Sequence, residues 1–286
     1  MLNCPYSCTY CYLLSYLEHR RIVVFTNTEK LKKNIEETLS DNPPLRLTTG
    51  ELGDSLALDH LTETTSELLP LFGGTETLFE LRTKSTRVEH LLESILNAST
   101  RPGEHGSSTP RKEAEKCGVS PMKDNLVITW TLGPDRAIRN EEPGTPTFDE
   151  RLEAMSLVSG AGIKVGIRFD PIIPFYADLA QYKRLVEGIA EAVDAKSIHR
   201  FELGCLRFPA GLWDHIRKNN PRSALLRGEY IKDREGKMRL YRPKRVKLYR
   251  DIYRSILSRF RDVPVELSME SRTVWEDVGL EPPSGT

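Results

Sequence analysis

Short apolar runs alternate with amphipathic segments from about residue 22 onward. Apolar residues at three- and four-residue spacing predict helices near 29–39, 61–71, 87–97, 147–160 and 177–193. The apolar runs between them predict strands at 22–25, 45–49, 77–81, 126–130, 164–169 and 201–205. Parallel neighbouring strands need a long return connection, which a helix supplies. The pattern therefore predicts an α/β fold with a parallel sheet, as an open or closed α/β barrel.

One stretch interrupts this alternation. Residues 98–123 are rich in Gly, Pro and Ser, a composition that predicts a flexible surface insertion. We predict a barrel domain over residues 1–210 that carries this insertion, and a basic C-terminal region over 211–286 that packs on the barrel.

Composition excludes several classes of protein. The 286 residues carry 41 Lys+Arg and 41 Asp+Glu, with 38% hydrophobic residues, which excludes a disordered polyelectrolyte chain. No uninterrupted apolar run approaches the roughly 18 residues of a membrane span. The start of the sequence has neither the basic nor the apolar part of a signal peptide, so we expect a cytoplasmic protein with no membrane partner.

The zero net charge conceals a basic segment. Residues 217–261 hold 16 Lys+Arg and 4 Asp+Glu, a local charge of +12, with four tyrosines among them: Tyr230, Tyr241, Tyr249 and Tyr253. Apolar positions around 245–260 follow a helical stripe, which leaves most basic side chains for another face. Two interpretations stay open, a solvated helix on an acidic scaffold and a surface that binds a polyanion such as DNA.

Three of the five cysteines lie within eight residues. Cys4, Cys8 and Cys11 form the pattern Cys-x3-Cys-x2-Cys, which lets one tight loop bring three thiolates to a single centre. An iron-sulfur cluster with three cysteine ligands keeps one iron open, whereas structural zinc needs a fourth ligand, from Cys117, Cys205 or a histidine such as His19. The spacing favours the cluster over zinc.

This cysteine pattern, followed by an aromatic residue at the head of a strand-helix series, resembles the signature of radical S-adenosylmethionine enzymes. Further motifs occur in the order seen in the spore photoproduct lyase family, at residues 8–12, 49–62, 83–92, 142–145 and 170–172. The ordered set spans most of residues 4–260, so the resemblance to this family is fairly specific.

The resemblance implies a fold and cofactors. The fold is a partial (β/α)6-type barrel of the radical S-adenosylmethionine kind. Because Cys4 almost opens the chain, either the sequence is truncated or the barrel lacks its first strand. Cys4, Cys8 and Cys11 would bind a [4Fe-4S] cluster, and S-adenosylmethionine would bind the open iron. The family then cleaves this cofactor with an electron from a donor such as flavodoxin or ferredoxin, and so initiates repair of a thymine dimer in DNA.

The resemblance also suggests further site residues. Gly50 and Glu51 follow a strand, where such enzymes offer a glycine and a carboxylate to the ammonium group of the cofactor; a solvent-facing acid is the alternative. Lys84 follows the next strand and could bind the cofactor carboxylate, or be a surface lysine. Thr131 and Asp170 also end strands and are candidates for the same face.

Two tyrosines of the cysteine loop complete this set. Tyr10 and Tyr12 could pack on the loop or relay a hydrogen atom, and packing is favoured for Tyr10.

One departure from the family concerns hydrogen return. The family's lyases have a cysteine that donates a hydrogen atom to the substrate radical, and Glu51 aligns with it here. A carboxylic acid cannot donate hydrogen atoms as a thiol does, so Cys205 is a candidate substitute, although a buried inert thiol is the commoner fate. Two other functions stay open: radical chemistry on a different substrate, and a non-catalytic nucleic-acid-binding protein that holds zinc or a structural cluster.

Overall fold

A computed structural model describes the chain except for residues 43, 101–120, 210 and 284–286, and except for the side chains of 97–100, 121 and 122. Most of the predicted insertion at 98–123, with Cys117, therefore lies outside the described residues. No helix within the described part of the chain has the length and apolar character of a membrane span.

Six parallel strands form one sheet in the order β1-β2-β3-β4-β5-β9. Their bounds are β1 Arg46–Thr49, β2 Leu78–Thr83, β3 Leu126–Thr131, β4 Lys164–Ile172, β5 Ile198–Cys205 and β9 Val265–Leu267. The sheet is that of a partial barrel, as predicted. Five of the six predicted strands are present, and β9 was not predicted because its three residues are too few to show a pattern.

Helices connect the strands, as parallel pairing requires. Between β1 and β2 lie α3 Asp59–Thr62, α4 Thr64–Leu68 and η1 Leu69–Phe72, and α2 Thr28–Asp41 precedes β1. The later crossovers contain α5 Glu89–Thr100, α7 Pro121–Asp124, α8 Asp135–Glu141, α9 Phe148–Gly160, η2 Pro174–Tyr176, α10 Leu179–Ala192 and η3 Ala195–Ser197. The helices predicted at 29–39, 87–97, 147–160 and 177–193 are thus confirmed, while 61–71 divides into three short helices.

The prediction of a strand at 22–25 is wrong. Val23 forms only an isolated antiparallel bridge with Leu2, and the side chains of Ile22, Val24 and Phe25 are exposed. A strand needs a neighbouring backbone to satisfy its amides, and these residues meet no sheet neighbour among the described residues. An apolar run of four residues does not show whether a neighbouring strand is present to pair with it.

The C-terminal segment contributes to the sheet and adds a small second one. After β5 come α11 Leu212–Asn219, η4 Ala224–Leu226 and a three-stranded antiparallel sheet of β6 Arg207–Phe208, β8 Met238–Leu240 and β7 Tyr230–Lys232. α12 Arg242–Leu257 and α13 Arg272–Val278 flank β9. Residues of α12, α13 and β9 belong to the same hydrophobic core as β1–β5. The division at residue 210 stays a prediction.

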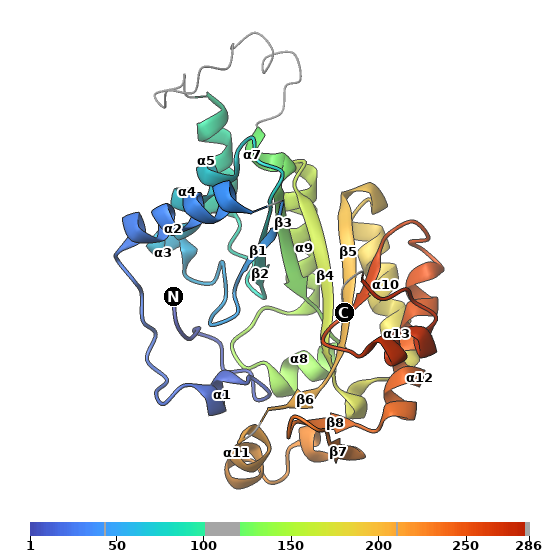
Figure 1. The fold of residues 1–286 in the computed structure, drawn as a ribbon. Helices are drawn as coiled ribbons and strands as arrows, with labels where there is room; N and C mark the ends of the chain where they lie inside the picture. Colours follow the sequence, from blue (N-terminus) through green and yellow to red (C-terminus); the bar gives the residue numbers. More distant parts are fainter. Residues whose placement is uncertain (43, 101–120, 210, 284–286) are drawn as a thin grey trace.

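The two sides of the sheet differ. Figure 1 shows α10, α12 and α13 on one side, while the N-terminal segment with α1 Leu13–Tyr16 lies on the other. Alternating strand residues such as Ile167, Phe169 and Leu203 pack under the helices in the core. The opposite face of the sheet is open to the N-terminal segment.

Candidate active site

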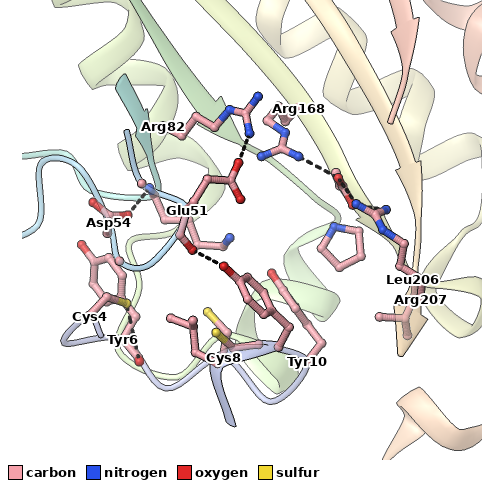
Figure 2. Close-up of a pocket in the computed structure, with 18 of the residues that line it drawn as sticks. Cys4, Tyr6, Cys8, Tyr10, Glu51, Asp54, Arg82, Arg168, Leu206 and Arg207 are labelled. Carbon is pink, nitrogen blue, oxygen red and sulfur yellow. Dashed lines mark hydrogen bonds and ion pairs between the residues drawn. The ribbon is translucent and has the colours of Figure 1, made fainter. Parts of the chain in front are cut away.

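A cavity of about 520 Å³ lies at the carboxyl ends of β1, β2 and β4, beside the N-terminal segment. Side chains from several parallel strands meet at this edge, where α/β barrels place their sites. Figure 2 shows Arg82 and Arg168 on the side of the strands, with Cys4 and Cys8 opposite them, below Glu51. Nine of the eleven predicted site residues line the cavity: Cys4, Cys8, Tyr10, Cys11, Tyr12, Gly50, Glu51, Lys84 and Asp170.

The three motif cysteines all face this cavity. Their loop has little regular structure, and within it the amide of Cys11 donates to the carbonyl of Cys8 at 3.1 Å. Burial raises the pKa of Cys8 to about 12 and the pKa of Cys4 to about 11. The metal-free thiols are therefore protonated at neutral pH, and metal binding would release protons.

The spacing of these thiols bears on the kind of metal centre. Among the described residues, no group of three or more His, Cys, Asp or Glu side chains is arranged to hold one metal ion. Structural zinc needs four such side chains around a single ion. In a cluster with three cysteine ligands each thiolate binds a different iron, so the sulfurs are spread around a shared space. Three cysteines around one cavity are the number of ligands that a cluster with one open iron would take.

The loop after β1 is fixed against the end of β2. Gly50 has a φ of +94°, and a Cβ atom there would lie 2.6 Å from the carbonyl oxygen of Arg82, so only glycine fits. Asp54 accepts hydrogen bonds from the Thr83 hydroxyl at 2.6 Å and from the Lys84 amide at 2.7 Å. These contacts hold the loop and the start of the Lys84 segment together at the edge of the cavity.

Glu51 connects this loop to two other parts of the site. Its carboxylate accepts a hydrogen bond from Arg82 Nη1 at 2.5 Å, and its side chain is 60% exposed. Its backbone carbonyl accepts the Tyr12 hydroxyl at 2.6 Å. Burial, with the nearby negative charge of Glu51, raises the pKa of Tyr12 to about 12. Tyr12 is therefore a neutral hydrogen-bond donor at neutral pH.

Lys84 faces the cysteine loop. Its ammonium lies 5.6 Å from the centre of the Tyr10 ring, within the range of a cation–π contact. Lys84 forms no ion pair with any carboxylate in the described part of the chain. Its positive charge faces the cavity, where an anionic ligand can meet it, and it also helps to lower the pKa of buried Glu142.

Asp170 is the centre of a charged group on the far side of the cavity. Its carboxylate pairs with Arg168 at 2.8 Å and Arg207 at 3.2 Å. Burial alone would raise the pKa of Asp170, but the charges of Arg207 and Arg168 outweigh burial and lower it to about 2. Gly204 on β5 makes room, because a Cβ atom there would lie 2.4 Å from the carboxyl carbon of Asp170.

Charged residues continue along the open face of the sheet. Buried Glu80 accepts hydrogen bonds from Arg200 at 2.9 Å and from the Thr129 hydroxyl at 2.6 Å. Glu202 pairs with Arg168 at 3.0 Å. The face that carries the site is therefore polar and held by ion pairs, while the opposite face is apolar.

Two predicted residues do not reach the cavity. Cys205 lies in the hydrophobic core, and its backbone amide donates to the Tyr249 hydroxyl at 2.8 Å. Burial raises the pKa of its thiol. Side chains alternate along β5, so Cys205 shares the helix-covered face with Leu203. Thr131 is also buried outside the lining, where its carbonyl accepts a hydrogen bond from Arg151 at 2.7 Å.

Several lining residues escaped the sequence analysis, namely Asp54, Arg82, Arg168, Arg207, Lys237 and Met269. For Arg82 and Arg168 a signal existed. Arg168 lies between Ile167 and Phe169 inside a strand, and Arg82 alternates with Glu80 around the apolar Leu81; such alternation marks a second, polar face of the sheet. Lys237 and Met269 follow no pattern that points to a site.

The basic segment 217–261 is only partly neutralised. Eight of its sixteen cations form ion pairs, for example Arg245 with Glu270 at 2.7 Å. The other eight are exposed and form no ion pair with a described residue: Lys218, Arg222, Arg227, Lys232, Arg234, Arg250, Arg254 and Arg261. Tyr249 is fully buried, and Tyr230 packs against Phe208 and Trp213, so neither is free to stack on a base.

Comparisons with known proteins agree with this architecture. The family model of spore photoproduct lyase matches residues 122–260. The spore photoproduct lyase of Bacillus subtilis (strain 168) is 27% identical over 230 residues, which cover 78% of this chain and 59% of that protein. The enzyme of the same name from Geobacillus sp. (strain Y412MC61) is 26% identical over 271 residues, 90% of this chain and 71% of that protein. The chain thus spans about three fifths of the length of the Bacillus relative.

A solved structure confirms the fold. A spore photoproduct lyase mutant with bound AdoMet and dinucleoside spore photoproduct superimposes with a TM-score of 0.74 at 24% identity, covering 92% of this chain and 74% of that chain. The six-stranded parallel half-barrel of this chain therefore matches the fold of that protein. By sequence the chain is similar to spore photoproduct lyases over most of its length, and it shares their fold.

Proposed function

We propose that this chain is a radical S-adenosylmethionine enzyme that initiates repair of a thymine-dimer lesion in DNA. The observation that carries the proposal is the meeting of Cys4, Cys8 and Cys11 with Glu51 and Lys84 in one cavity, at the carboxyl edge of a parallel half-barrel. The Bacillus and Geobacillus relatives are named for lesion cleavage, and one solved relative holds both AdoMet and the lesion.

The residues present fit the two cofactors. Cys4, Cys8 and Cys11 would hold a [4Fe-4S] cluster by one thiolate each, which leaves the fourth iron for S-adenosylmethionine. When bound, cluster and cofactor together supply the one-electron reductive cleavage that starts radical chemistry. The ammonium of Lys84 would bind the cofactor carboxylate by a charge-assisted hydrogen bond.

Other residues of the cavity would position the reactants. The loop of Gly50 and Glu51 presents a carboxylate for the cofactor ammonium, and Arg82 holds that carboxylate in place. Tyr12 ties this loop to the cysteine loop through its bond to the Glu51 carbonyl. Asp170 stays ionised between its two arginines, so it can accept hydrogen bonds at neutral pH but cannot donate a proton.

The basic segment would bind the DNA backbone. Its eight exposed, unpaired cations can contact phosphates, and Lys237, from the same segment, lines the cavity itself. Binding through phosphates releases counterions, so affinity should fall steeply with salt concentration. A lesion within a duplex must also turn outward to reach a cavity of this kind.

A second candidate keeps the radical chemistry but changes its outcome. Glu51 occupies the position of the family's hydrogen-donating cysteine, and its carboxylate is paired with Arg82. Among the described residues, the cavity holds no cysteine besides the three proposed cluster ligands. The substrate radical would then need another hydrogen source, or the enzyme would convert a different lesion.

Anaerobic reconstitution with iron and sulfide tests the proposal. We expect about four irons per chain in the wild type and a loss of most of them in Cys8→Ala, with Cys205→Ala as the matched control that retains them. Added S-adenosylmethionine should change the electron paramagnetic resonance spectrum of the reduced protein. One zinc and no iron per chain would instead support a non-catalytic metal-binding protein.

The substrate is tested with the reconstituted enzyme. Reductive cleavage of S-adenosylmethionine is measured with irradiated DNA and with unirradiated DNA, and restored thymine is measured in parallel. Cleavage with restored thymine supports lesion repair. Cleavage that irradiated DNA stimulates without restoring thymine supports the second candidate, and cleavage that no DNA affects indicates a substrate other than DNA.

A further inference from the structure

The cysteine loop is held by the segment that follows α8. The amide of Ser7 donates to the carbonyl of Pro143 at 3.2 Å, and the amide of Thr9 donates to the carbonyl of Glu141 at 2.8 Å. The two contacts run in antiparallel order, although Thr9 and Glu141 lie 132 residues apart in sequence. The Thr9 hydroxyl also donates to the carboxylate of Glu141. The loop therefore takes its shape from a distant part of the barrel.

A buried ion pair lies at the centre of this contact. Glu142 accepts the Tyr10 hydroxyl at one carboxylate oxygen and Arg151 Nη2 at the other, the latter at 2.6 Å. Arg151 is completely buried in α9. Its remaining donors reach the carbonyls of Thr131 at 2.7 Å and Pro146 at 3.0 Å. Arg151 thus fixes Glu142, and Glu142 fixes Tyr10.

Stability alone is a weak explanation for such a pair. Burying a carboxylate and a guanidinium seldom stabilises a protein more than apolar residues of the same size would. Neither Glu142 nor Arg151 lines the cavity. Tyr10, which they hold, does line it, and in sequence it stands between the lining residues Cys8 and Cys11. The position of Tyr10 is therefore the feature of the site that this pair controls.

We propose that Glu142, fixed by Arg151, is a positioning residue that sets the cysteine loop in its cluster-binding shape before any metal is present. The inference deepens the proposed function and rests on it, because the loop's purpose is to hold a cluster. Its structural part concerns the metal-free chain alone. The two can therefore be tested separately.

The first test alkylates the metal-free protein with iodoacetamide under anaerobic conditions and follows each cysteine by peptide mass spectrometry. Tyr10→Phe removes only the hydroxyl that binds Glu142. Tyr16→Phe is the matched control, since Tyr16 is 66% exposed and near the loop. Losing a hydrogen bond to a charged group favours local opening by about tenfold or more, so Cys8 should react about tenfold faster in Tyr10→Phe and unchanged in Tyr16→Phe.

Buried Cys205 is the internal reference for this test. A positioning role leaves the alkylation rate of Cys205 unchanged, while Cys8 becomes reactive. Parallel acceleration of Cys8 and Cys205 would mean general loosening and would overturn the proposal. An unchanged rate at Cys8 would overturn it as well.

The second test measures iron retention after reconstitution. Glu142→Gln keeps the shape of the side chain but leaves Arg151 without its counter-charge, and Glu150→Gln alters an exposed neighbouring carboxylate as control. We expect a chelator to strip iron several-fold faster from Glu142→Gln and Tyr10→Phe than from wild type. Equal stripping rates in wild type and both variants would refute the positioning role and leave the proposed function intact. A wild type that binds no iron would refute the proposed function, while the alkylation result would still decide whether the pair orders the loop.

Discussion

Asp170→Asn probes how firmly the charged side of the cavity is built. The substitution keeps the size of the side chain and removes the negative charge between Arg168 and Arg207. The pKa of Asp170 is lowered from 3.8 to about 2. At about 1.4 kcal/mol for each tenfold change in proton affinity, this depression corresponds to about 2 to 3 kcal/mol of stability.

The sign of the pH dependence follows from the direction of that change. Because the folded-state pKa lies below the unfolded value, the stabilisation is fully present above about pH 4 and is lost as the pH falls toward 2. The variant cannot ionise at this position. The difference in unfolding free energy between wild type and Asp170→Asn should therefore shrink by about 1 kcal/mol between pH 6 and pH 3.

Urea unfolding at several pH values measures this difference. Tryptophan fluorescence and circular dichroism should give the same transition, which justifies the use of free energies. Asp262→Asn is the control, because Asp262 is exposed and forms no ion pair with a cation among the described residues. If the difference in unfolding free energy between wild type and Asp170→Asn stays constant from pH 6 to pH 3, the conclusion that the two arginines hold this carboxylate ionised is refuted.

Three further predictions concern the cavity. Gly50→Ala should lower the free energy of unfolding by roughly 1–3 kcal/mol through backbone strain, and the contact to the Arg82 carbonyl should add to this loss. Thermal unfolding measures the effect. Gly160→Ala is the control that should leave stability unchanged, because a methyl group there meets nothing within 4 Å. Lys84→Met should weaken S-adenosylmethionine binding by about tenfold or more in equilibrium dialysis of the reconstituted protein, and wild-type affinity in this variant would remove Lys84 from the site. Glu51→Cys should raise the yield of restored thymine per S-adenosylmethionine cleaved, because it returns a thiol to the position of the family's hydrogen donor; an unchanged yield would show that the missing thiol does not limit the reaction.

Local pattern was sufficient for most of the architecture. Amphipathic helices and apolar strands in regular alternation leave a parallel sheet as the arrangement that buries them, so the α/β sheet followed from the pattern, and the resemblance to the family implied the partial barrel. The cysteine loop was visible because metal ligands must be close in space and can be supplied by neighbours in sequence. The placement of Gly50, Glu51, Lys84 and Asp170 in one cavity followed from a rule of topology, since each ends or follows a parallel strand.

Contacts between distant segments were beyond the sequence. Cys205 and Gly204 are neighbours, yet strand alternation sends one into the core and leaves the other facing Asp170. Only the assembled sheet defines which face is which. The strand predicted at 22–25 failed for a related reason, because pairing depends on a partner and not on apolar character alone.

The sequence by itself determined the parallel α/β sheet, the loop of three cysteines and the resemblance to spore photoproduct lyases. The tertiary structure decided which polar groups meet. Glu142, for example, binds both Arg151 and the hydroxyl of Tyr10, and the three residues come from separate segments. The physical reason is the range of the interactions. Periodicity and ligand spacing act over a few residues, whereas ion pairs and hydrogen bonds act over a few ångströms and become definite only when the packed core has brought their partners together.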